Sequence, residues 1–202
     1  MKTIIFDINE DKKLFKKSAL AVRKGAVAVF ATDTVYGIGT NAFNKKSVLK
    51  IYKLKKRPVS KPLPLLVSSV TMAKKFVIWN KFAQKLAKKF LPGALTLVLN
   101  PKPKFGFNLQ QGLALRIADH KKLLQWIKCA GVPIASTSAN LSAKPAVTKA
   151  SDAIKKFNGK VDYILTDGNL KGAESDVVDL RGKTPVILRQ RKIKLSNIKK
   201  IV

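Results

Sequence analysis

Short apolar runs alternate with amphipathic stretches along most of the chain. The apolar runs are rich in Val, Ile, Leu and Phe and have the length of buried strands. This pattern predicts strands at 3–8, 26–31, 63–67, 95–99, 113–117, 133–136, 163–165, 177–180 and 186–188.

The amphipathic stretches between these runs predict helices with recognisable ends. Gly25 suits the residue that ends a helix in the left-handed conformation. Asn80 suits an N-cap, and Pro92-Gly93 stops the helix that Asn80 begins. The helices predicted in this way are 11–24, 45–56, 80–90, 121–130 and 148–157.

Alternating strands and helices are typical of an α/β sheet that helices cover. The last three predicted strands follow one another without a helix, so we expect a mixed sheet rather than a purely parallel one. The 202 residues are the length of one ordinary domain, and no Gly/Ser-rich or Pro-rich linker and no internal repeat divides them. We therefore expect residues 1–202 to form a single domain.

The chain is strongly basic, with 41 Lys and Arg against 11 Asp and Glu and a formal charge of +30. A field of this sign concentrates phosphates at the surface, so it favours nucleotides, nucleic acid or another polyanion as partner. A lysine bias across a whole proteome would also give this excess, since 35 of the basic residues are Lys and 6 are Arg. Such a bias does not explain why residues 34–118 hold 15 Lys and 2 Arg but no acid.

The same sequence excludes several classes of protein. Cys129 is the only cysteine, which rules out a disulfide framework and a multi-cysteine zinc site. No apolar run approaches the roughly 18 residues that span a bilayer, and residues 1–9 lack the features of a signal peptide. We therefore expect a cytoplasmic protein with no membrane partner.

Four polar loop segments lie directly beside predicted apolar strands, where functional groups often lie. In the first, residues 31–39, two threonines, Asp33 and Tyr36 come after a buried strand, and two glycines permit close approach of the backbone. The glycines fit neither a dinucleotide fingerprint nor a phosphate-binding P-loop. A polar turn held by its own side-chain hydrogen bonds is the alternative interpretation of this segment.

The second segment, residues 54–63, follows a helix and combines Lys55, Arg57 and Lys61 with two prolines. The prolines reduce the entropy that such a loop loses when it closes on an anion. A solvated basic helix end is the alternative, because lysine favours the negative end of the helix dipole. We prefer that alternative for Lys56 but not for Arg57.

The third segment places Arg116 inside an apolar run, where a charge is costly unless it is paired. Asp119 or a carboxylate of a ligand would provide that partner. His120 is the only histidine, and we expect it to begin a helix rather than to act in catalysis.

In the fourth segment, residues 133–140, a short apolar strand is followed by side chains with three hydroxyls and one amide. It lacks the Gly-x-Ser-x-Gly turn that carries the nucleophile of a hydrolase. Neutral donors and acceptors at this density suit a nucleotide or an amino acid.

Taken together, these segments resemble the YrdC/TsaC family over nearly the whole chain. The motifs that carry the resemblance are, in order, Thr32-Asp-Thr-Val-Tyr-Gly-Ile-Gly39, Lys55-x-Arg57-Pro, Lys61-Pro-Leu63, Pro92-Gly-Ala-Leu-Thr96, Leu115-Arg116 and Ser136-Thr-Ser-Ala-Asn140. The resemblance implies a twisted α/β sheet, flanked by helices, with a positively charged cavity. It also implies a nucleotidyltransferase that makes threonylcarbamoyl-AMP and pyrophosphate from L-threonine, bicarbonate and ATP, for the t6A modification at position 37 of tRNA.

Position by position, the resemblance implies two groups of ligand residues. Those implied to bind threonine are Thr32, Thr34, Tyr36, Arg116, Ser136 and Ser175. Those implied to bind ATP are Lys55, Arg57, Lys61, Thr96, Ser138, Asn140 and Arg189, of which Lys55 and Arg57 would also be catalytic. Mg²⁺ would be held mainly by ATP, with no metal site of the protein's own.

Two positions depart from the family pattern. Asp176 stands where the family usually has Thr, and Leu66 stands where the longer members have His. The chain therefore resembles the short members, which lack an additional C-terminal domain.

The arginines support the ligand residues without reference to the family. Three of the six arginines, Arg57, Arg116 and Arg189, fall at these positions in a chain that otherwise uses lysine. A guanidinium offers carboxylate or phosphate a planar fork that an ammonium cannot copy.

Two other functions remain open at this point. The charge also suits a non-catalytic RNA-binding protein of the same fold, with tRNA as partner, although an RNP-type aromatic motif and a GxxG clamp are missing. Carbamoyl transfer from carbamoyl phosphate, as in hydrogenase-maturation proteins with a YrdC-like domain, is disfavoured because their zinc-finger and acylphosphatase-like segments are missing. In the pathway that the resemblance implies, threonylcarbamoyl-transferase proteins would take the product.

Overall fold

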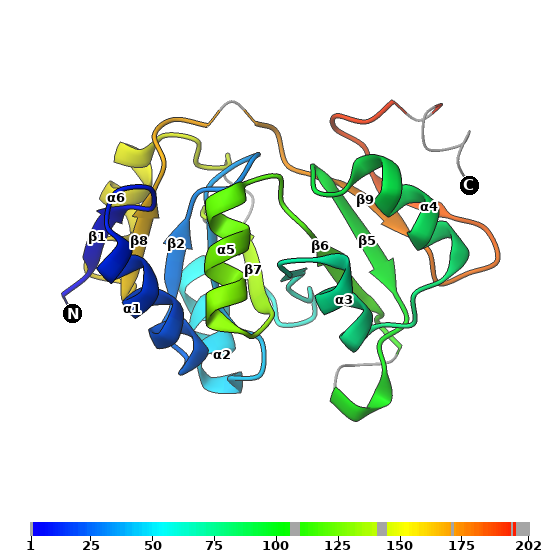
Figure 1. The fold of residues 1–202 in the computed structure, drawn as a ribbon, viewed down its shortest axis with the longest axis horizontal. Coiled ribbons are helices and arrows are strands. Elements are labelled where there is room, and N and C mark those ends of the chain that lie inside the picture. The colour runs from blue at the N-terminus through cyan, green and yellow to red at the C-terminus, as the bar shows by residue number, and fades with distance from the viewer. Residues whose placement is uncertain (1, 106–109, 141–144, 171, 195, 197–202) are drawn as a thin grey trace.

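The centre of the fold is one ten-stranded mixed sheet with the strand order β1-β8-β2-β3-β7-β4-β6-β5-β9-β10 (Figure 1). The computed structural model describes residues 2–105, 110–140, 145–170, 172–194 and 196. The strands are β1 (Ile4–Asp7), β2 (Ala28–Phe30), β3 (Gly37–Asn41), β4 (Leu65–Leu66), β5 (Leu95–Leu99), β6 (Leu113–Arg116), β7 (Ile134–Ser138), β8 (Tyr163–Thr166), β9 (Asp176–Asp179) and β10 (Val186–Arg189).

The helices begin and end where the sequence supplies capping groups. They are α1 (Lys12–Arg23), α2 (Lys45–Lys55), α3 (Val70–Phe76), α4 (Lys81–Phe90), α5 (Lys121–Ala130) and α6 (Ala150–Phe157), with a short 3-10 helix η1 (Pro103–Phe105). The Asn80 side chain accepts a hydrogen bond from the Ala83 N–H at 2.9 Å, which confirms the predicted N-cap of α4. Gly25 has φ +105° directly after α1, as the predicted helix end requires.

The sheet combines parallel and antiparallel pairs, which confirms the mixed α/β class. β8 pairs in parallel with β1 and β2, and β4 and β5 pair in parallel with β6 and β9 respectively. The other neighbouring strands are antiparallel. Among the described residues, no helix is both long enough and apolar enough to cross a bilayer.

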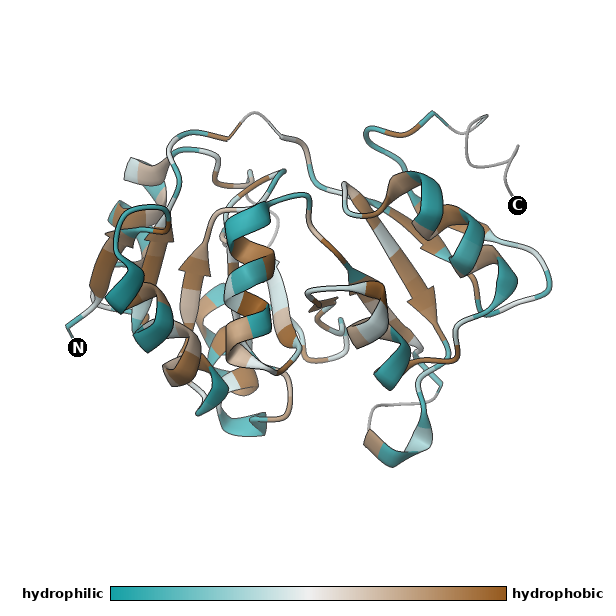
Figure 2. Cartoon of the chain, in the orientation of Figure 1, coloured by the Kyte–Doolittle hydropathy of each residue, from teal (hydrophilic) through white to brown (hydrophobic). Residues whose placement is uncertain are grey.

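Helices cover both faces of the half of the sheet that holds β1, β2 and β8. On one face α1 and α5 bury Val22, Trp126 and their neighbours against Phe30, and the rings of Phe30 and Trp126 lie 5.7 Å apart. On the other face α2 and α6 bury Ile51 and Phe157 against the same strands. Figure 2 shows the result, with hydrophobic strands inside and hydrophilic outer helix faces.

In the half of the sheet that holds β5, this strand has apolar side chains on one face and a polar side chain on the other. Leu95, Leu97 and Leu99 pack in one hydrophobic cluster with Ala83 and Leu86 of α4. Side chains alternate along a strand, so Thr96 faces the opposite side. That side carries the cavity described below, and α3 and α4 therefore cover the face away from it.

Two elements depart from the pattern that the sequence shows. β3 consists of Gly-Ile-Gly-Thr-Asn. Because glycine and asparagine are poor strand formers, the prediction from sequence put its first residues in a polar loop. Its pairing with β2 and β7 holds it in the sheet. The sequence also does not indicate α3, a helix of seven residues that the Ser69 side chain caps at Met72 N–H.

Candidate active site

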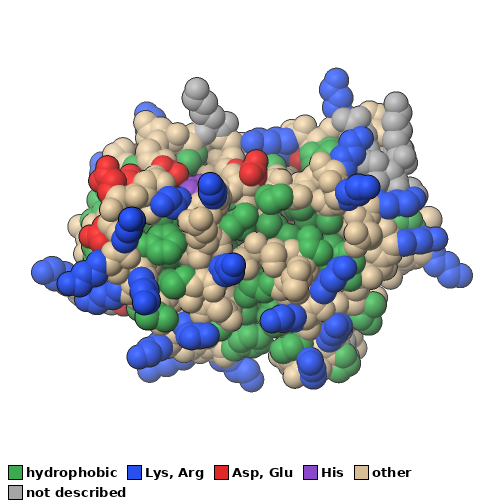
Figure 3. Space-filling view, viewed as in Figure 1, with side chains coloured by type: hydrophobic (Ala, Val, Ile, Leu, Met, Phe, Trp, Pro, Cys, Tyr) green, Lys and Arg blue, Asp and Glu red, His purple; other side chains and the backbone are tan. Residues whose placement is uncertain are grey.

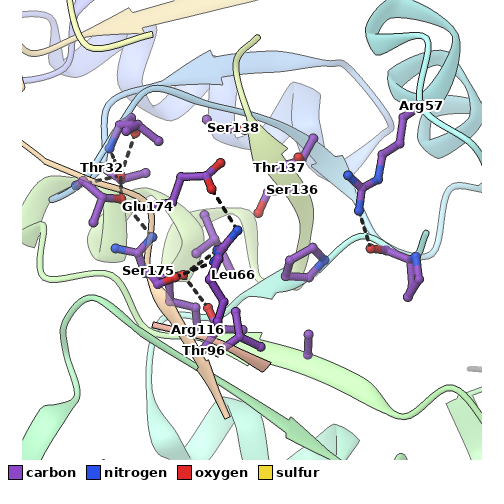
Figure 4. A pocket seen from close by; sticks show the side chains of 18 residues that line it. Thr32, Arg57, Leu66, Thr96, Arg116, Ser136, Thr137, Ser138, Glu174 and Ser175 are labelled. Atoms are coloured by element: carbon purple, nitrogen blue, oxygen red, sulfur yellow. Dashed lines mark hydrogen bonds and ion pairs between the residues drawn. The ribbon is translucent and has the colours of Figure 1, made fainter. Parts of the chain in front are cut away.

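A cavity of about 290 Å³ opens over the middle strands of the sheet. Figure 4 shows Arg57 on one side of it, with Thr32, Glu174 and Ser175 on the other. The volume is at the lower end of the roughly 300–1,000 Å³ typical of small-molecule sites. Nine of the thirteen predicted ligand residues line it, namely Thr32, Thr34, Arg57, Thr96, Arg116, Ser136, Ser138, Ser175 and Arg189.

Arg116 is buried in β6 and is paired with Asp33. Its Nη2 lies 2.6 Å from Asp33 Oδ1, its Nη1 donates to Thr34 Oγ1 at 2.9 Å, and its Nε donates to the Gly93 carbonyl at 3.1 Å. The sequence suggested Asp119 as the partner of Arg116. The partner is instead Asp33, on the loop after β2. Burial lowers the pKa of Arg116, while the Asp33 carboxylate acts to raise it.

Thr32 and Thr34 form a turn that also lines the cavity. Thr32 Oγ1 donates to the Val35 carbonyl at 2.7 Å and accepts from the Thr34 N–H at 3.1 Å. The two hydroxyl oxygens lie 2.9 Å apart. The local hydrogen-bonded turn that the sequence offered as an alternative is thus present, and the turn itself aims both threonines at the cavity.

Arg57 is held by its own loop at the cavity edge. Its Nε donates to the Lys61 carbonyl at 3.0 Å, and its Nη2 donates to the Pro62 carbonyl at 3.2 Å. The Tyr52 hydroxyl donates to the same Lys61 carbonyl at 3.1 Å. These contacts use two of the five N–H groups of the guanidinium, so the side chain is fixed with donors left for an anion.

The end of β7 is held by a buried lysine. Lys55 Nζ donates to the Ser138 carbonyl, to the Asn140 carbonyl at 2.6 Å and to Asn140 Oδ1 at 3.1 Å. Ser138 Oγ donates to the same Oδ1 at 2.5 Å. Burial, together with the nearby charge of Arg57, lowers the pKa of Lys55 to about 8.

The segment that joins β8 to β9 carries the far wall of the cavity. We call residues 167–170 and 172–175 the crossing segment, and Figure 1 shows it passing from one half of the sheet to the other. Ser175 Oγ lies 2.8 Å from Thr96 Oγ1. Arg189 Nη1 pairs with Glu174 Oε2 at 2.9 Å, and Arg189 Nε donates to the Ser175 carbonyl at 2.9 Å.

Asp176, where the family usually has Thr, is fully buried next to Ser175. Its carboxylate accepts hydrogen bonds from the backbone N–H groups of Arg191, Lys192 and Ile193 at 2.6, 3.1 and 3.1 Å. Val177 and Ser175 line the cavity, so Asp176 points to the other face of β9. The departure therefore ties down the chain after β10 and leaves the cavity wall unchanged.

Four predicted ligand residues are not part of the cavity lining: Lys55, Tyr36, Lys61 and Asn140. The Tyr36 hydroxyl donates to the Gly168 carbonyl at 2.7 Å and accepts from the Asp167 N–H at 3.2 Å, so it anchors the crossing segment. Burial raises the pKa of Tyr36. The Lys61 side chain is exposed, and its carbonyl supports Arg57.

His120 caps a helix, as expected. Its Nδ1 accepts from the Leu123 N–H at 3.2 Å at the start of α5. Its Nε2 lies 2.9 Å from Asp167 Oδ2. His120 is therefore in contact with the first residue of the crossing segment, and it lies outside the cavity lining.

Sequence reasoning missed the carboxylate and the apolar part of the lining. Glu174 is the one acid among the residues that line the cavity. Glu174 directly precedes the predicted ligand residue Ser175, but nothing in the sequence indicated that its side chain points inward. Val35, Leu66, Ala114 and Val177 supply apolar surface between the polar groups, and as members of buried strands or turns they resemble ordinary core residues.

The lining can hold a small molecule with several anionic groups. Arg57, Arg116 and Arg189 reach it from three different elements, and hydroxyls from β5, β7 and the crossing segment lie between them. The described residues contain no group of three or more His, Cys, Asp or Glu that could hold a metal ion.

The fold and the site define an α/β protein with an arginine- and hydroxyl-lined ligand cavity, and the sequence comparison identifies its family. The model of the Sua5/YciO/YrdC family, described as "Telomere recombination", matches residues 20–191. The chain belongs to this family, which confirms the resemblance that the motifs show.

Similar proteins in this family include named enzymes. The threonylcarbamoyl-AMP synthase of Pyrococcus abyssi is 36% identical over 99% of this chain and 61% of the relative. That of Bacillus subtilis is 36% identical over 92% of this chain and 56% of the relative. The crystal structure of P. abyssi Sua5 complexed with L-threonine matches with a TM-score of 0.90 and 32% identity, over 100% of this chain and 61% of that one. The chain thus spans about three fifths of the length of these relatives.

Proposed function

We propose that this chain is an L-threonylcarbamoyladenylate synthase, which makes threonylcarbamoyl-AMP and pyrophosphate from L-threonine, bicarbonate and ATP. The observation that carries the proposal is the convergence of nine predicted ligand residues, from distant parts of the sequence, on one cavity. The identity to named synthases supports it. The product would serve the t6A modification of tRNA in the cytoplasm, through threonylcarbamoyl-transferase proteins.

The side of the cavity around Arg116 suits threonine. The contacts to Asp33, Thr34 and Gly93 use three of the five N–H groups of the guanidinium. The remaining donors can bind the carboxylate of an amino acid. The hydroxyls of Thr32, Ser136 and Ser175 line the same cavity and can meet the hydroxyl of the substrate.

The side around Arg57 suits ATP. Arg57 and Ser138 line the cavity, and Asn140 and Lys61 stand next to the lining. Arg189 and Thr96 line the far wall beside Ser175, across the cavity from Arg57. Charge-assisted hydrogen bonds of this kind are each worth roughly 1.5–3 kcal/mol. Mg²⁺ would enter as part of the ATP complex, with phosphate oxygens as ligands, which is usual for this ion.

The reaction then needs positioning and charge neutralisation rather than a covalent intermediate. The amine of threonine adds to CO2 derived from bicarbonate, a C–N bond forms, and the nitrogen loses a proton to give a carbamate. A carbamate oxygen attacks the α-phosphorus of ATP, the bond to the bridging oxygen breaks, and pyrophosphate leaves. The arginines offset the phosphate charge, and the cavity fixes the reacting groups.

The direct test is the source of the carbamoyl carbon. With ¹³C-labelled bicarbonate, L-threonine and ATP, mass spectrometry should detect threonylcarbamoyl-AMP that carries the label. A nucleotide product without the label, or no such product, would refute the proposal.

One observation favours RNA binding as a second function. Six exposed lysines on α3 and α4 cover the face away from the cavity, namely Lys74, Lys75, Lys81, Lys85, Lys88 and Lys89. Figure 3 shows lysines over this half, while most visible acids gather at the end that holds β1 and α1. If this face binds tRNA, the affinity falls steeply with salt, whereas synthesis of threonylcarbamoyl-AMP needs no RNA.

A further inference from the structure

Lys55 is the only lysine among the buried polar and charged residues of the described chain, with 2% of its surface exposed. It is the last residue of α2, and its ammonium reaches across to the end of β7. Its described hydrogen-bond partners there are all oxygens of Ser138 and Asn140. An isolated buried charge is costly, so these hydrogen bonds have to compensate the buried charge of the Lys55 ammonium.

The three contacts match the three N–H donors of an ammonium, one to each oxygen. A neutral amine has two donors, so it cannot make all three contacts at once. The charged groups that act on Lys55 are Arg57, on the loop after α2, and Glu174, on the crossing segment. From β7, the partners that face it are neutral.

These contacts fix Ser138 and Asn140, two of the residues that the proposed function assigns to ATP. Asn140 Oδ1 accepts from both Lys55 Nζ and Ser138 Oγ. Lys55 therefore sets the orientation of the Asn140 amide and, through it, of the Ser138 hydroxyl. The ammonium lies outside the cavity lining, whereas Ser138, one of the two residues that it holds, lines the cavity.

We propose that Lys55 is a positioning residue, which acts on ATP through Ser138 and Asn140 rather than by touching a phosphate. This proposal rests on the proposed function, since it assumes that Ser138 and Asn140 meet the nucleotide. It replaces the expectation, drawn from the motif, that Lys55 contacts the phosphates itself.

The test is a mutant cycle measured as ATP dissociation constants, so it does not depend on product formation. Lys55→Met weakens ATP binding about 10- to 100-fold in the wild-type background, because the Asn140 amide and the Ser138 hydroxyl lose the ammonium that orients them. In the Ser138→Ala/Asn140→Ala background, where the side chains that it orients are gone, the same substitution costs less than about threefold. The matched control is Lys56→Met, one residue further on at an exposed position, which changes ATP binding less than about twofold.

A direct phosphate contact gives the opposite result in the cycle. Lys55→Met would then cost the same factor in both backgrounds, and this outcome, or no effect in the wild-type background, overturns the proposal. If wild-type protein binds ATP but makes no threonylcarbamoyl-AMP, the proposed function fails while the cycle still decides the role of Lys55.

A second measurement needs no substitution of Lys55 and so stands if Lys55→Met does not fold. Burial lowers the pKa of Lys55 to about 8, so the ammonium loses a proton, and one hydrogen bond, as pH rises past 8. ATP affinity of the wild-type protein falls from pH 7 to 9.5, and this fall is absent in the Ser138→Ala/Asn140→Ala variant. A fall of equal size in that variant contradicts positioning.

Discussion

Arg116 Nη2 lies 2.6 Å from Asp33 Oδ1, and this pair joins the loop after β2 to the strand β6, whose Arg116 lines the cavity. The carboxylate compensates the buried charge and, with Thr34 and Gly93, fixes the plane of the guanidinium. A binding group held in this way loses little entropy when a ligand arrives. Asp33 is thus part of the site because it orients Arg116.

Arg116→Lys should weaken threonine binding at least tenfold, because an ammonium cannot keep Asp33 and also present a planar fork. ATP binding should change less than about threefold. Titration of each ligand separately checks this. Arg181→Lys is the matched control, since Arg181 pairs with Asp179 at 2.6 Å outside the cavity lining. Equal losses of threonine affinity in the two variants would contradict the assignment of Arg116.

Arg57→Lys should lose most of the activity while the protein stays folded. The substitution removes the hydrogen bonds from Nε and Nη2 to the Lys61 and Pro62 carbonyls. It also removes the fork for phosphate. We expect a melting temperature within a few degrees of wild type and a kcat/KM for ATP reduced at least about tenfold. A fully active Arg57→Lys protein would show that the geometry of the guanidinium is not needed.

Gly172 should tolerate no side chain, because a Cβ built there would lie 2.1 Å from the Thr34 carbonyl oxygen. Gly172→Ala should push the crossing segment away from the turn of Thr32 and Thr34, and so reduce both stability and threonine affinity. Gly168→Ala is the control on the same segment. Gly168 has φ +59° but an open environment, so that change should cost about 1 kcal/mol of stability and leave threonine affinity intact.

If both glycine variants bind L-threonine equally well, the crossing segment does not position the turn that Thr32 and Thr34 form. Calorimetric titration with threonine gives the affinities, and urea unfolding gives the stabilities.

The Asp179–Arg181 pair makes stability depend on pH. Hydrogen bonds from Arg181 lower the pKa of Asp179 in the folded protein. A depressed folded-state pKa adds stability above the unfolded-state pKa of about 3.9, and that stability is lost as pH falls below it. Asp179→Asn should therefore destabilise the protein by about 1 kcal/mol at pH 7, and the difference should shrink as pH falls below the unfolded-state pKa and through the lower folded-state pKa. Urea unfolding over a series of pH values checks this, and a difference that does not shrink as pH falls would contradict the charge as its cause.

Much of the fold follows from local patterns in the sequence. The predicted ranges of β5 and α5 match the observed strands and helices, because their apolar periodicity is complete and their ends carry clear signals. β3 does not follow from its own sequence, since two glycines give it little side-chain pattern and its partners β2 and β7 lie elsewhere in the chain.

The site shows the same division. The motifs identify most residues of the lining, because polar groups beside buried strands are conspicuous in the sequence. They do not reveal that Arg116 pairs with Asp33 rather than Asp119, or that Lys55 is buried outside the cavity lining. Both depend on the order of strands in the sheet, which no local pattern specifies.

The central claim, that this cavity couples threonine and bicarbonate to ATP, is tested most directly by pyrophosphate release from ATP. The protein with ATP and Mg²⁺ should release pyrophosphate only when L-threonine and bicarbonate are both present, and one pyrophosphate should form for each threonylcarbamoyl-AMP. Release that continues when either L-threonine or bicarbonate is left out would contradict the claim.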